Sequence, residues 1–385
     1  MKRLFALLLA VLLLAAAAGC TTREEPAATP EPEPAETAAP TLAPTPQPST
    51  VPIPEATPEV TAEPSPEPTS EPTPVEELKY RNFFNGTPIA EPDYSRPFAV
   101  MINNIKEAQP QCGISAADII YEVLAEGGVT RMMAIFSDIR SAEHLGSIRS
   151  IRPYYIDISL GYGAISVHAG GSDDAYTRIR REKFDDIDGV NSYPVTNLFY
   201  RDQARRSSGY AVEHTLFTEG DRLYETAEKL GFNLTLPENY DNGLRFEKDA
   251  TPKDGQSAKE IKIEYNIGKK TDLIYHEDTG LYTAQQLGGD YIDGNTKEAL
   301  TFRNLIVIEA YTKMLDNYGR LRVDLIANGE GYYVCGGKYE PITWKRDSVD
   351  DCFHYYRADG SELTVSEGKT FISVLARNQS VITFE

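Results

Sequence analysis

The chain has 385 residues, and its 38 Lys and Arg against 58 Asp and Glu give it a net charge of −20. An acidic protein repels phosphate backbones, so this balance disfavours nucleic acid as a partner. The single long apolar run lies at the extreme N-terminus, which excludes a polytopic membrane protein.

The first twenty residues indicate export and anchoring. Lys2 and Arg3 precede an apolar run over 4–18, a length typical of a signal peptide and short for a spanning helix. The order Ala-Ala-Gly-Cys over 17–20 resembles the bacterial lipobox, although Ala17 stands where Leu is usual. In such signals the Cys receives a diacylglyceryl group and becomes the new N-terminus. We therefore expect lipid chains, palmitate among them, on Cys20. The alternative is an ordinary secretory signal with a Cys nearby.

A segment rich in Pro, Glu and Thr follows. Residues 21–77 hold 12 Glu, a single Arg and 16 of the 25 prolines, without apolar periodicity. Such a composition cannot bury enough surface to fold, so we expect a disordered linker. Fully extended, it would reach roughly 180 Å, at about 3.1 Å per residue. The segment would act as a stalk that lifts the folded part from the membrane, or as a linker whose length matters little. A third reading is a docking site formed by a proline motif.

Residues 90–240 read as a mixed α/β domain. Helices are expected over 153–161, 172–184 and 219–230, with Ser172 and Thr218 as N-caps and Gly231 as a stop. The expected strands are 96–104, 117–126, 130–138 and 163–171.

Residues 259–385 read as a β-rich C-terminal domain, because seven strand-like runs alternate with turn residues. The stretch 233–258 would connect the two domains. The fold class expected for the whole is therefore α+β, with a mixed first domain and a β-rich second one. Cys112, Cys335 and Cys352 remain after lipidation of Cys20, so at least one thiol is free. A disulfide between Cys335 and Cys352 is one reading, and no Cys or His spacing typical of structural zinc occurs.

Candidate site residues gather in the first domain. Glu122 and Glu126 belong to the first strand of an expected hairpin and Arg131 to the second. With a loop of two or four residues the three side chains share a face, whereas an odd loop would separate them. A buried Glu122 needs a charged partner, and Arg131 is the nearest candidate. Three roles are open for these side chains: a structural cross-strand ion pair, a face that binds a ligand or metal, or plain exposure to solvent.

Two further arginines, Arg149 and Arg152, lie in an irregular segment directly before the helix that starts at Pro153. Planar guanidinium groups in such a position suit bidentate capture of carboxylate or phosphate. Salt bridges to the many acidic residues of the chain are the alternative. The proximity of Arg131 within a net acidic domain favours a binding site.

His168 ends a strand, two glycines follow, and a helix begins at Ser172. Such turns expose backbone N–H groups and suit anions, although Asp173 and Asp174 already occupy the first helical turn. A histidine at the carboxyl end of a strand is either a site residue or a structural one. His214 is a weaker candidate.

Ordered motifs in this chain resemble the YerB-like lipoproteins, a bacterial family of unknown function with separate N- and C-terminal domains. The motifs include "RPFAVMINN", "ADIIYEVLAEGGVTRMMAIF" and "LGSIRSIRPYYIDISLGYGAISVHAGG". The resemblance implies an envelope lipoprotein on the outer face of the cytoplasmic membrane of a Gram-positive bacterium, and it implies no reaction.

A looser similarity links the chain to the LytR-CpsA-Psr phosphotransferases, which use Arg and Asp residues on and beside central strands. Asp118, Arg131, Arg149 and Arg152 would be analogous in order, although the motifs do not align cleanly and those enzymes are usually anchored by a spanning helix.

Three hypotheses follow. In the first, the protein is a lipid-anchored lipoprotein that binds an anionic cell-wall or other envelope ligand, needs no cofactor, and uses a cluster of side chains. These are Glu122, Glu126, Arg131, Arg149, Arg152 and His168. In the second, it is a phosphotransferase or hydrolase acting on a polyprenyl-phosphate-linked precursor, with Mg²⁺ held by Asp118, Glu122 or Glu126. In the third, it is a non-catalytic scaffold.

Overall fold

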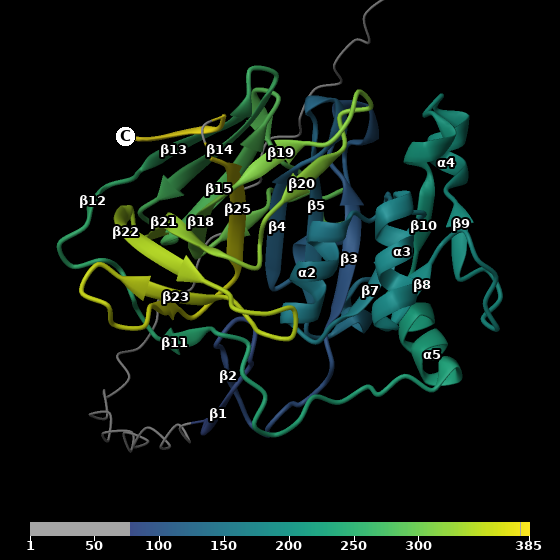
Figure 1. Ribbon diagram of the computed structural model, residues 1–385, viewed down its shortest axis with the longest axis horizontal. Helices are drawn as coiled ribbons and strands as arrows, with labels where there is room; N and C mark the ends of the chain where they lie inside the picture. The colour runs from purple at the N-terminus through teal and green to yellow at the C-terminus, as the bar shows by residue number, and fades with distance from the viewer. Residues whose placement is uncertain (1–77, 378) are drawn as a thin grey trace, which may run out of the picture. The chain divides into compact units, whose positions relative to one another are not determined.

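The computed structural model describes residues 78–377 and 379–385, which belong to one compact unit. Cys20, the predicted signal peptide and the predicted linker lie outside the described residues. Among the described helices, none has the length and apolar character needed to cross a membrane. The described chain is strand-rich with few helices, consistent with the expected mixture of the two (Figure 1).

Eleven strands of the described part form one mixed sheet. Its order is β12 (Gln256–Ser257), β22 (Lys338–Lys345), β21 (Asn328–Cys335), β18 (Asn304–Ala310), β25 (Thr370–Ala376), β4 (Ile119–Leu124), β5 (Thr130–Phe136), β3 (Phe98–Asn103), β7 (Ile165–His168) and β8 (Asp186–Asp188), with β23 (His354–Arg357) beside β22. The sheet takes strands from both segments predicted as domains, because β4 pairs in parallel with β25. The predicted boundary between those segments stays a prediction.

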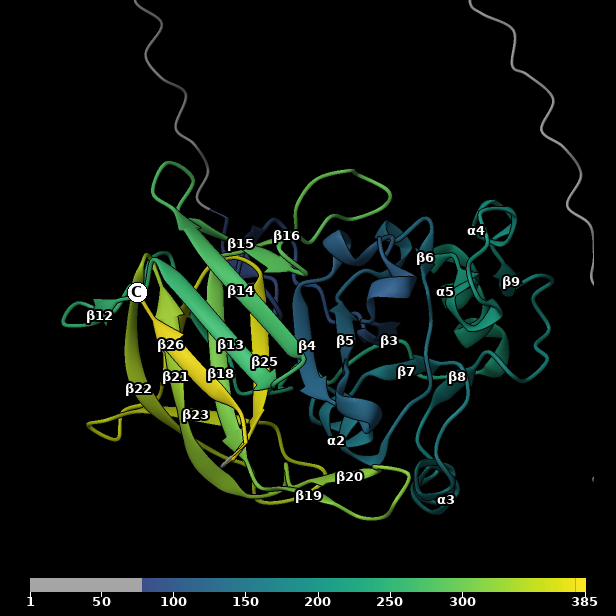
Figure 2. The ribbon, with the colours of Figure 1, turned by 90° about the horizontal axis from the view of Figure 1, so that it is seen from above.

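A second sheet of six described strands packs against this main sheet (Figure 2). It contains β16 (Gly289–Asp290), β15 (Leu281–Gln286), β14 (Lys269–His276), β13 (Glu260–Asn266), β26 (Val381–Phe384) and β17 (Thr301–Phe302). Alternate residues of β3 to β5 enter the core between the two sheets, and the intervening residues pack against helix α2 (Pro153–Gly161) on the other face. This alternation follows from the period of two along a strand.

The predicted helices are confirmed as α2, α3 (Asp173–Glu182) and α5 (Gly220–Leu230). Ser172 caps α3, because its Oγ accepts the N–H of Ala175 at 3.3 Å, and Gly231 ends α5 at a φ of 73°. The prediction of Thr218 as a cap was wrong. Glu219 takes the N-cap position, while the Thr218 hydroxyl donates to the carbonyl of Leu198 at 2.7 Å.

Smaller elements complete the described chain. The short pairings are β1 (Tyr80–Arg81) with β2 (Pro88–Ile89), β10 (Leu216–Thr218) with β6 (Leu145–Gly146) and β9 (Phe199–Arg201), β11 (Arg245–Glu247) with β24 (Thr364–Ser366), and β19 (Thr312–Met314) with β20 (Leu321–Val323). The short helices are α4 (Gln203–Ser207), η1 (Lys106–Ala108), η2 (Ile114–Ala116), η3 (Glu126–Gly128), η4 (Ile139–Ser141) and η5 (Val212–His214). The β19–β20 hairpin reaches α3, where Arg320 Nη1 lies 3.6 Å from Asp174 Oδ2 (Figure 2).

The disulfide reading for Cys335 and Cys352 was wrong. Both cysteines are free and buried in the described structure, as is Cys112. The Cys335 thiol instead lies 3.1 Å from the hydroxyl of Ser366 in the core.

Candidate functional site: an arginine-lined cavity

A cavity of about 710 Å³ opens where β4 and β5 meet the starts of α2 and α3. Its ionic lining consists of four arginines and two acids, namely Arg131, Arg149, Arg152, Arg320, Glu126 and Asp173. The cavity therefore carries two positive charges in excess, although the protein as a whole has a net charge of −20. A local excess of this sign attracts anions.

The loop between β4 and β5 has five residues, and this length decides the register. Val123 pairs with Arg131, and Glu122 pairs with Met132. Because neighbouring residues of a strand face opposite sides, Glu122 and Arg131 lie on opposite faces of the main sheet. The reading that puts Glu122 and Glu126 on one face with Arg131 was therefore wrong for Glu122.

Glu126 holds two of the cavity arginines. Its Oε1 accepts a hydrogen bond from Nε of Arg152, and its buried Oε2 lies 3.5 Å from Nη2 of Arg131. Burial acts to raise the pKa of Glu126, but the hydrogen bond and charge of Arg152, with help from Arg131, lower it overall. Glu126 is therefore a carboxylate at neutral pH and fixes the two guanidinium groups in place.

Arg131 and Arg149 differ in how their charges are compensated. Arg131 is 9% exposed, and its Nη1 donates to the carbonyl of Ser150 at 2.5 Å. Arg149 is half-buried, and among the described residues no hydrogen-bond acceptor and no acidic side chain contacts its guanidinium. Burial is the main cause that lowers the pKa of Arg149. The charge of Arg152 lowers this pKa further, whereas the charge of Glu213 acts in the opposite direction. Arg149 is thus a cation for which an added anion would supply the partner.

The N-terminus of α3 and the β19–β20 hairpin form the other walls. Ser172 and Asp173 bring the positive end of the α3 dipole to the cavity. Arg320 from the hairpin lies 2.5 Å from Asp316 Oδ2, and Tyr318 beside it is 87% exposed. The sequence pointed to neither hairpin residue, because both follow Arg152 by more than 160 positions and no motif marks them.

Glu122 lies outside the cavity, in the core between the two sheets. It is fully buried, and it accepts hydrogen bonds from Asn104 Nδ2 at 2.8 Å, Thr130 Oγ1 at 2.5 Å and Thr271 Oγ1 at 2.8 Å. Its charged partner is Lys269, whose Nζ is 3.4 Å away, and not Arg131 as the sequence suggested. The surroundings indicate a structural role for this carboxylate.

The two candidate histidines also lie beside the cavity rather than in it. His168 is fully buried, with Nδ1 2.9 Å from the carbonyl of Gly170 and Nε2 3.2 Å from Asp186 Oδ2. These contacts hold the turn that leads to Ser172 at the cavity wall. His214 Nδ1 lies 3.1 Å from Asn103 Nδ2, and burial lowers the pKa of His214.

The three carboxylates considered for Mg²⁺ do not meet. Asp118 precedes β4, where it accepts hydrogen bonds from Asn85 Nδ2 at 2.6 Å and from the N–H of Ser137 at 2.8 Å. Glu126 follows β4, so roughly 20 Å of strand separates the two, at about 3.3 Å per residue. Glu122 is enclosed by the donors of the core. Their arrangement does not form a shared magnesium site.

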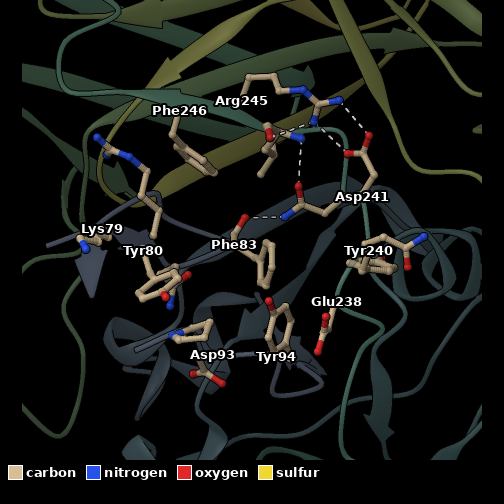
Figure 3. A pocket seen from close by; sticks show the side chains of 16 residues that line it. Lys79, Tyr80, Phe83, Asp93, Tyr94, Glu238, Tyr240, Asp241, Arg245 and Phe246 are labelled. Carbon is tan, nitrogen blue, oxygen red and sulfur yellow. Dashed lines mark hydrogen bonds and ion pairs between the residues drawn. The ribbon is translucent and has the colours of Figure 1, made fainter. Parts of the chain in front are cut away.

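A second cavity of about 610 Å³ lies near the start of the described chain (Figure 3). Aromatic side chains, including Tyr80, Phe83 and Tyr94, surround it, and Arg245 binds Asp241 through two contacts of 2.8 Å. Its three cationic side chains are balanced by three carboxylates. It therefore lacks the excess positive charge of the arginine-lined cavity.

Comparisons with known proteins agree with the resemblance seen in the sequence. Family models described as the N-terminal and C-terminal domains of a protein of unknown function (DUF3048) match residues 84–233 and 261–372. The "Putative lipoprotein YerB" of Bacillus subtilis (strain 168) is 30% identical over 284 residues, which are 73% of this chain and 81% of that protein. The crystal structure of YerB from Bacillus subtilis superposes with a TM-score of 0.68 at 27% identity, covering 79% of this chain and 100% of that one.

Proposed function

The chain belongs to the DUF3048 family and is related to YerB of Bacillus subtilis, and we propose that it is an envelope lipoprotein that binds an anionic ligand in the arginine-lined cavity. The name of the relative supports the lipoprotein part of this proposal, together with the signal-like residues that end at Cys20. The family is one of unknown function, so the ligand must be inferred from the cavity.

The observation that carries the binding proposal is that no described acidic side chain contacts Arg149, although the charge of Glu213 acts on it from a distance. Glu126 engages Arg152 and Arg131, and Asp316 engages Arg320, whereas no acidic side chain of the described residues lies within ion-pair distance of Arg149. A half-buried cation without a counterion lowers stability unless a ligand supplies one. A cation of this kind at the wall of a positively charged cavity is suited to anchor an anion.

The geometry favours phosphate or carboxylate groups as the part of the ligand that is recognised. Guanidinium groups present paired N–H donors that match two oxygens of such anions. The cavity volume of about 710 Å³ exceeds the needs of a single phosphate ion, so we expect a larger envelope component that carries the anionic group. The ligand would approach from outside the cell, where the lipid on Cys20 would hold the protein at the membrane.

The binding test uses inorganic pyrophosphate as the probe in isothermal titration calorimetry with the full-length mature protein. Arg149→Ala should weaken binding at least about tenfold, equivalent to about 1.4 kcal/mol. It should not lower the melting temperature of the ligand-free protein, because the guanidinium has no contacting partner to lose and its burial without a counterion is unfavourable. Arg181→Ala, which removes a 71% exposed arginine of α3, serves as the matched control and should bind as the wild type does. Equal losses in both variants, or no heat of binding at millimolar pyrophosphate, would overturn the proposal.

The anchoring test compares the wild type with Cys20→Ser in a bacterial host supplied with labelled palmitate. We expect the wild type to carry the label and to sediment with membranes, and the variant to lose the label. Incorporation of palmitate into Cys20→Ser would contradict lipidation at this residue. Binding and anchoring fail separately, because the first is measured on purified protein.

A further inference from the structure

Three potential metal ligands converge between β22 and β23, in a part of the molecule that the proposed function does not use. They are Asp351, Cys352 and His354, and one donor atom from each lies within 4.8 Å of the other two. The Asp351 Oδ1 is 3.0 Å from the His354 Nε2, and the Cys352 Sγ is 3.6 Å from the same nitrogen. We propose that these three side chains form a zinc-binding site.

Two of the three separations between the ligand atoms are close to those around a tetrahedral zinc ion. With Zn–N and Zn–O bonds of about 2.0 Å and a Zn–S bond of about 2.3 Å, two ligand atoms at the tetrahedral angle lie about 3.3 Å apart for N and O, and about 3.5 Å apart for N and S. The observed distances of 3.0 and 3.6 Å differ little from these values. The third separation, between an Asp351 carboxylate oxygen and the Cys352 Sγ, is within 4.8 Å, so the carboxylate would turn toward the sulfur when the ion binds.

The loop that carries Asp351 is held in position by Arg346, which is 1% exposed. The Arg346 guanidinium donates to the carbonyls of Asp351 at 2.7 Å, Val349 at 2.8 Å and Asp157 at 2.6 Å. The second carboxylate oxygen of Asp351 accepts the N–H of Asp347 at 3.0 Å. Three ligands on a clamped loop lose little conformational entropy when they bind a metal ion.

The donor set selects the metal. A thiolate and an imidazole suit Zn²⁺, whereas Mg²⁺ and Ca²⁺ prefer sets of oxygen atoms. The side chains of Asp351 and His354 are 26% and 28% exposed, so an ion has access from solvent. Three protein ligands leave the fourth tetrahedral position to water, as in open zinc sites. Cys352 is available for this role because its thiol is not in a disulfide.

A simpler arrangement of the same residues is an ion pair between Asp351 and His354 with the thiol as a bystander. Co²⁺ distinguishes the two, because a thiolate bound to Co²⁺ gives a charge-transfer band that a carboxylate–imidazole pair cannot give. The full-length mature protein, treated with chelator under reducing conditions, would be titrated with Co²⁺ and then with Zn²⁺ in competition with a chromophoric chelator. We expect one equivalent of each metal, the band with Co²⁺, and displacement of Co²⁺ by Zn²⁺.

Two variants and one control complete the test. Cys352→Ser should abolish the band, and His354→Ala should weaken zinc binding at least about tenfold, or about 1.4 kcal/mol. Cys112→Ser is the matched control, because Cys112 and Cys352 are both 7% exposed, and it should retain the band and the affinity. Zinc should also raise the melting temperature of the wild type and not that of Cys352→Ser.

Failure to bind one equivalent of Zn²⁺ would overturn the proposal, as would a charge-transfer band in Cys352→Ser equal to that of the wild type. Loss of folding does not confuse these results, provided that the metal-free melting temperatures of the variants match that of the metal-free wild type. Pyrophosphate binding should be unaffected in His354→Ala, which separates this site from the arginine-lined cavity.

Discussion

Glu122 and Glu126 are four positions apart, yet their surroundings give them different roles. Glu126 is the shared partner of two arginines at a cavity wall, and Glu122 is enclosed by donors from two sheets. Residue type and spacing alone treat the two as equivalent. What separates them is the partner that each meets after folding, and the partners of Glu122 include Lys269 and Thr271 from a distant part of the chain.

Glu122→Ala should destabilise the protein by about 3–5 kcal/mol. The substitution leaves Lys269 without its charged partner and several buried hydrogen-bond donors without an acceptor. Urea unfolding followed by circular dichroism measures the change. Glu264→Ala, which removes an exposed ion pair with Lys270, should cost less than about 1 kcal/mol. A cost for Glu122→Ala no larger than that of the control would show that the buried network is not structural.

The lowered pKa of Glu126 predicts that the protein loses stability in acid. Its pKa in the folded protein lies below the ordinary value of 4.5, since Arg152 and Arg131 outweigh the effect of burial. The unfolded chain then binds the proton more readily, so the carboxylate stabilises the fold above pH 4.5 and this contribution is lost as the pH falls through the folded pKa.

Unfolding measured from about pH 7 to about pH 3 should show that Glu126→Gln is less stable than the wild type at the upper end, and that the difference shrinks toward the lower end. A difference that stays constant over this range would mean that Glu126 does not titrate with a lowered pKa.

At the scale of elements, apolar periodicity and cap residues predicted α2, α3, α5 and the strands of the β4–β5 hairpin. The same signals could not fix the register of the hairpin, because strand ends are uncertain by one or two residues and one residue changes the face. The five-residue loop decided it, with Gly127 at a φ of 72° in its middle. Arg131, Arg149 and Arg152 were predicted as a cluster because they are close in sequence.

The three side chains of the proposed zinc site were not singled out in the sequence, for a related reason. Asp351 and Cys352 are neighbours, and His354 follows two residues later, which is shorter than the spacings typical of structural zinc. The signal available in the sequence was the Cys-x-His pair, since side chains two apart in an extended segment share a face. The clamp by Arg346 that arranges the loop has no counterpart in a sequence pattern.

Helix α5 begins in close contact with the backbone of η4, and this contact requires a glycine. A Cβ on Gly220 would lie 1.8 Å from the carbonyl oxygen of Ile139. Gly220→Ala should therefore destabilise the protein by about 1–3 kcal/mol, in spite of the higher helix propensity of Ala. Gly289→Ala, where nothing lies within 4 Å of the added carbon, should stay within about 0.5 kcal/mol of the wild type in the same thermal and urea measurements. Equal stability of the two variants would mean that α5 can move away from η4.

For the whole molecule, the main sheet is the feature that sequence patterns could not reveal. Both predicted segments showed strands, but pairing between β4 and β25 depends on contacts that no local pattern encodes. The arginine-lined cavity depends on the same long-range association, because Arg320 reaches it from the β19–β20 hairpin. The sequence indicated where many of the longer strands lie, but it missed many of the short ones and could not give the partners of any.

The shared sheet predicts that the two segments do not fold separately. A chain truncated after residue 258 would leave β4 with an unpaired edge and Glu122 without Lys269. We expect this truncated chain to aggregate or to lack a cooperative melting transition by circular dichroism, while the full-length protein melts as one unit. A soluble, cooperatively melting fragment that binds pyrophosphate would contradict this expectation.

The pairing of Ile119 with Thr370 also sets the order in which the protein can be completed. A polypeptide that leaves the ribosome or the export channel begins with its N-terminus, so β4 emerges long before its parallel neighbour β25. One edge of β4 stays unpaired until Thr370–Ala376 has emerged, and contacts so distant along the chain form slowly. Maturation of this protein should therefore be limited by the release of β25, and a chain that stops shortly before Thr370 should be as defective as one that stops far earlier.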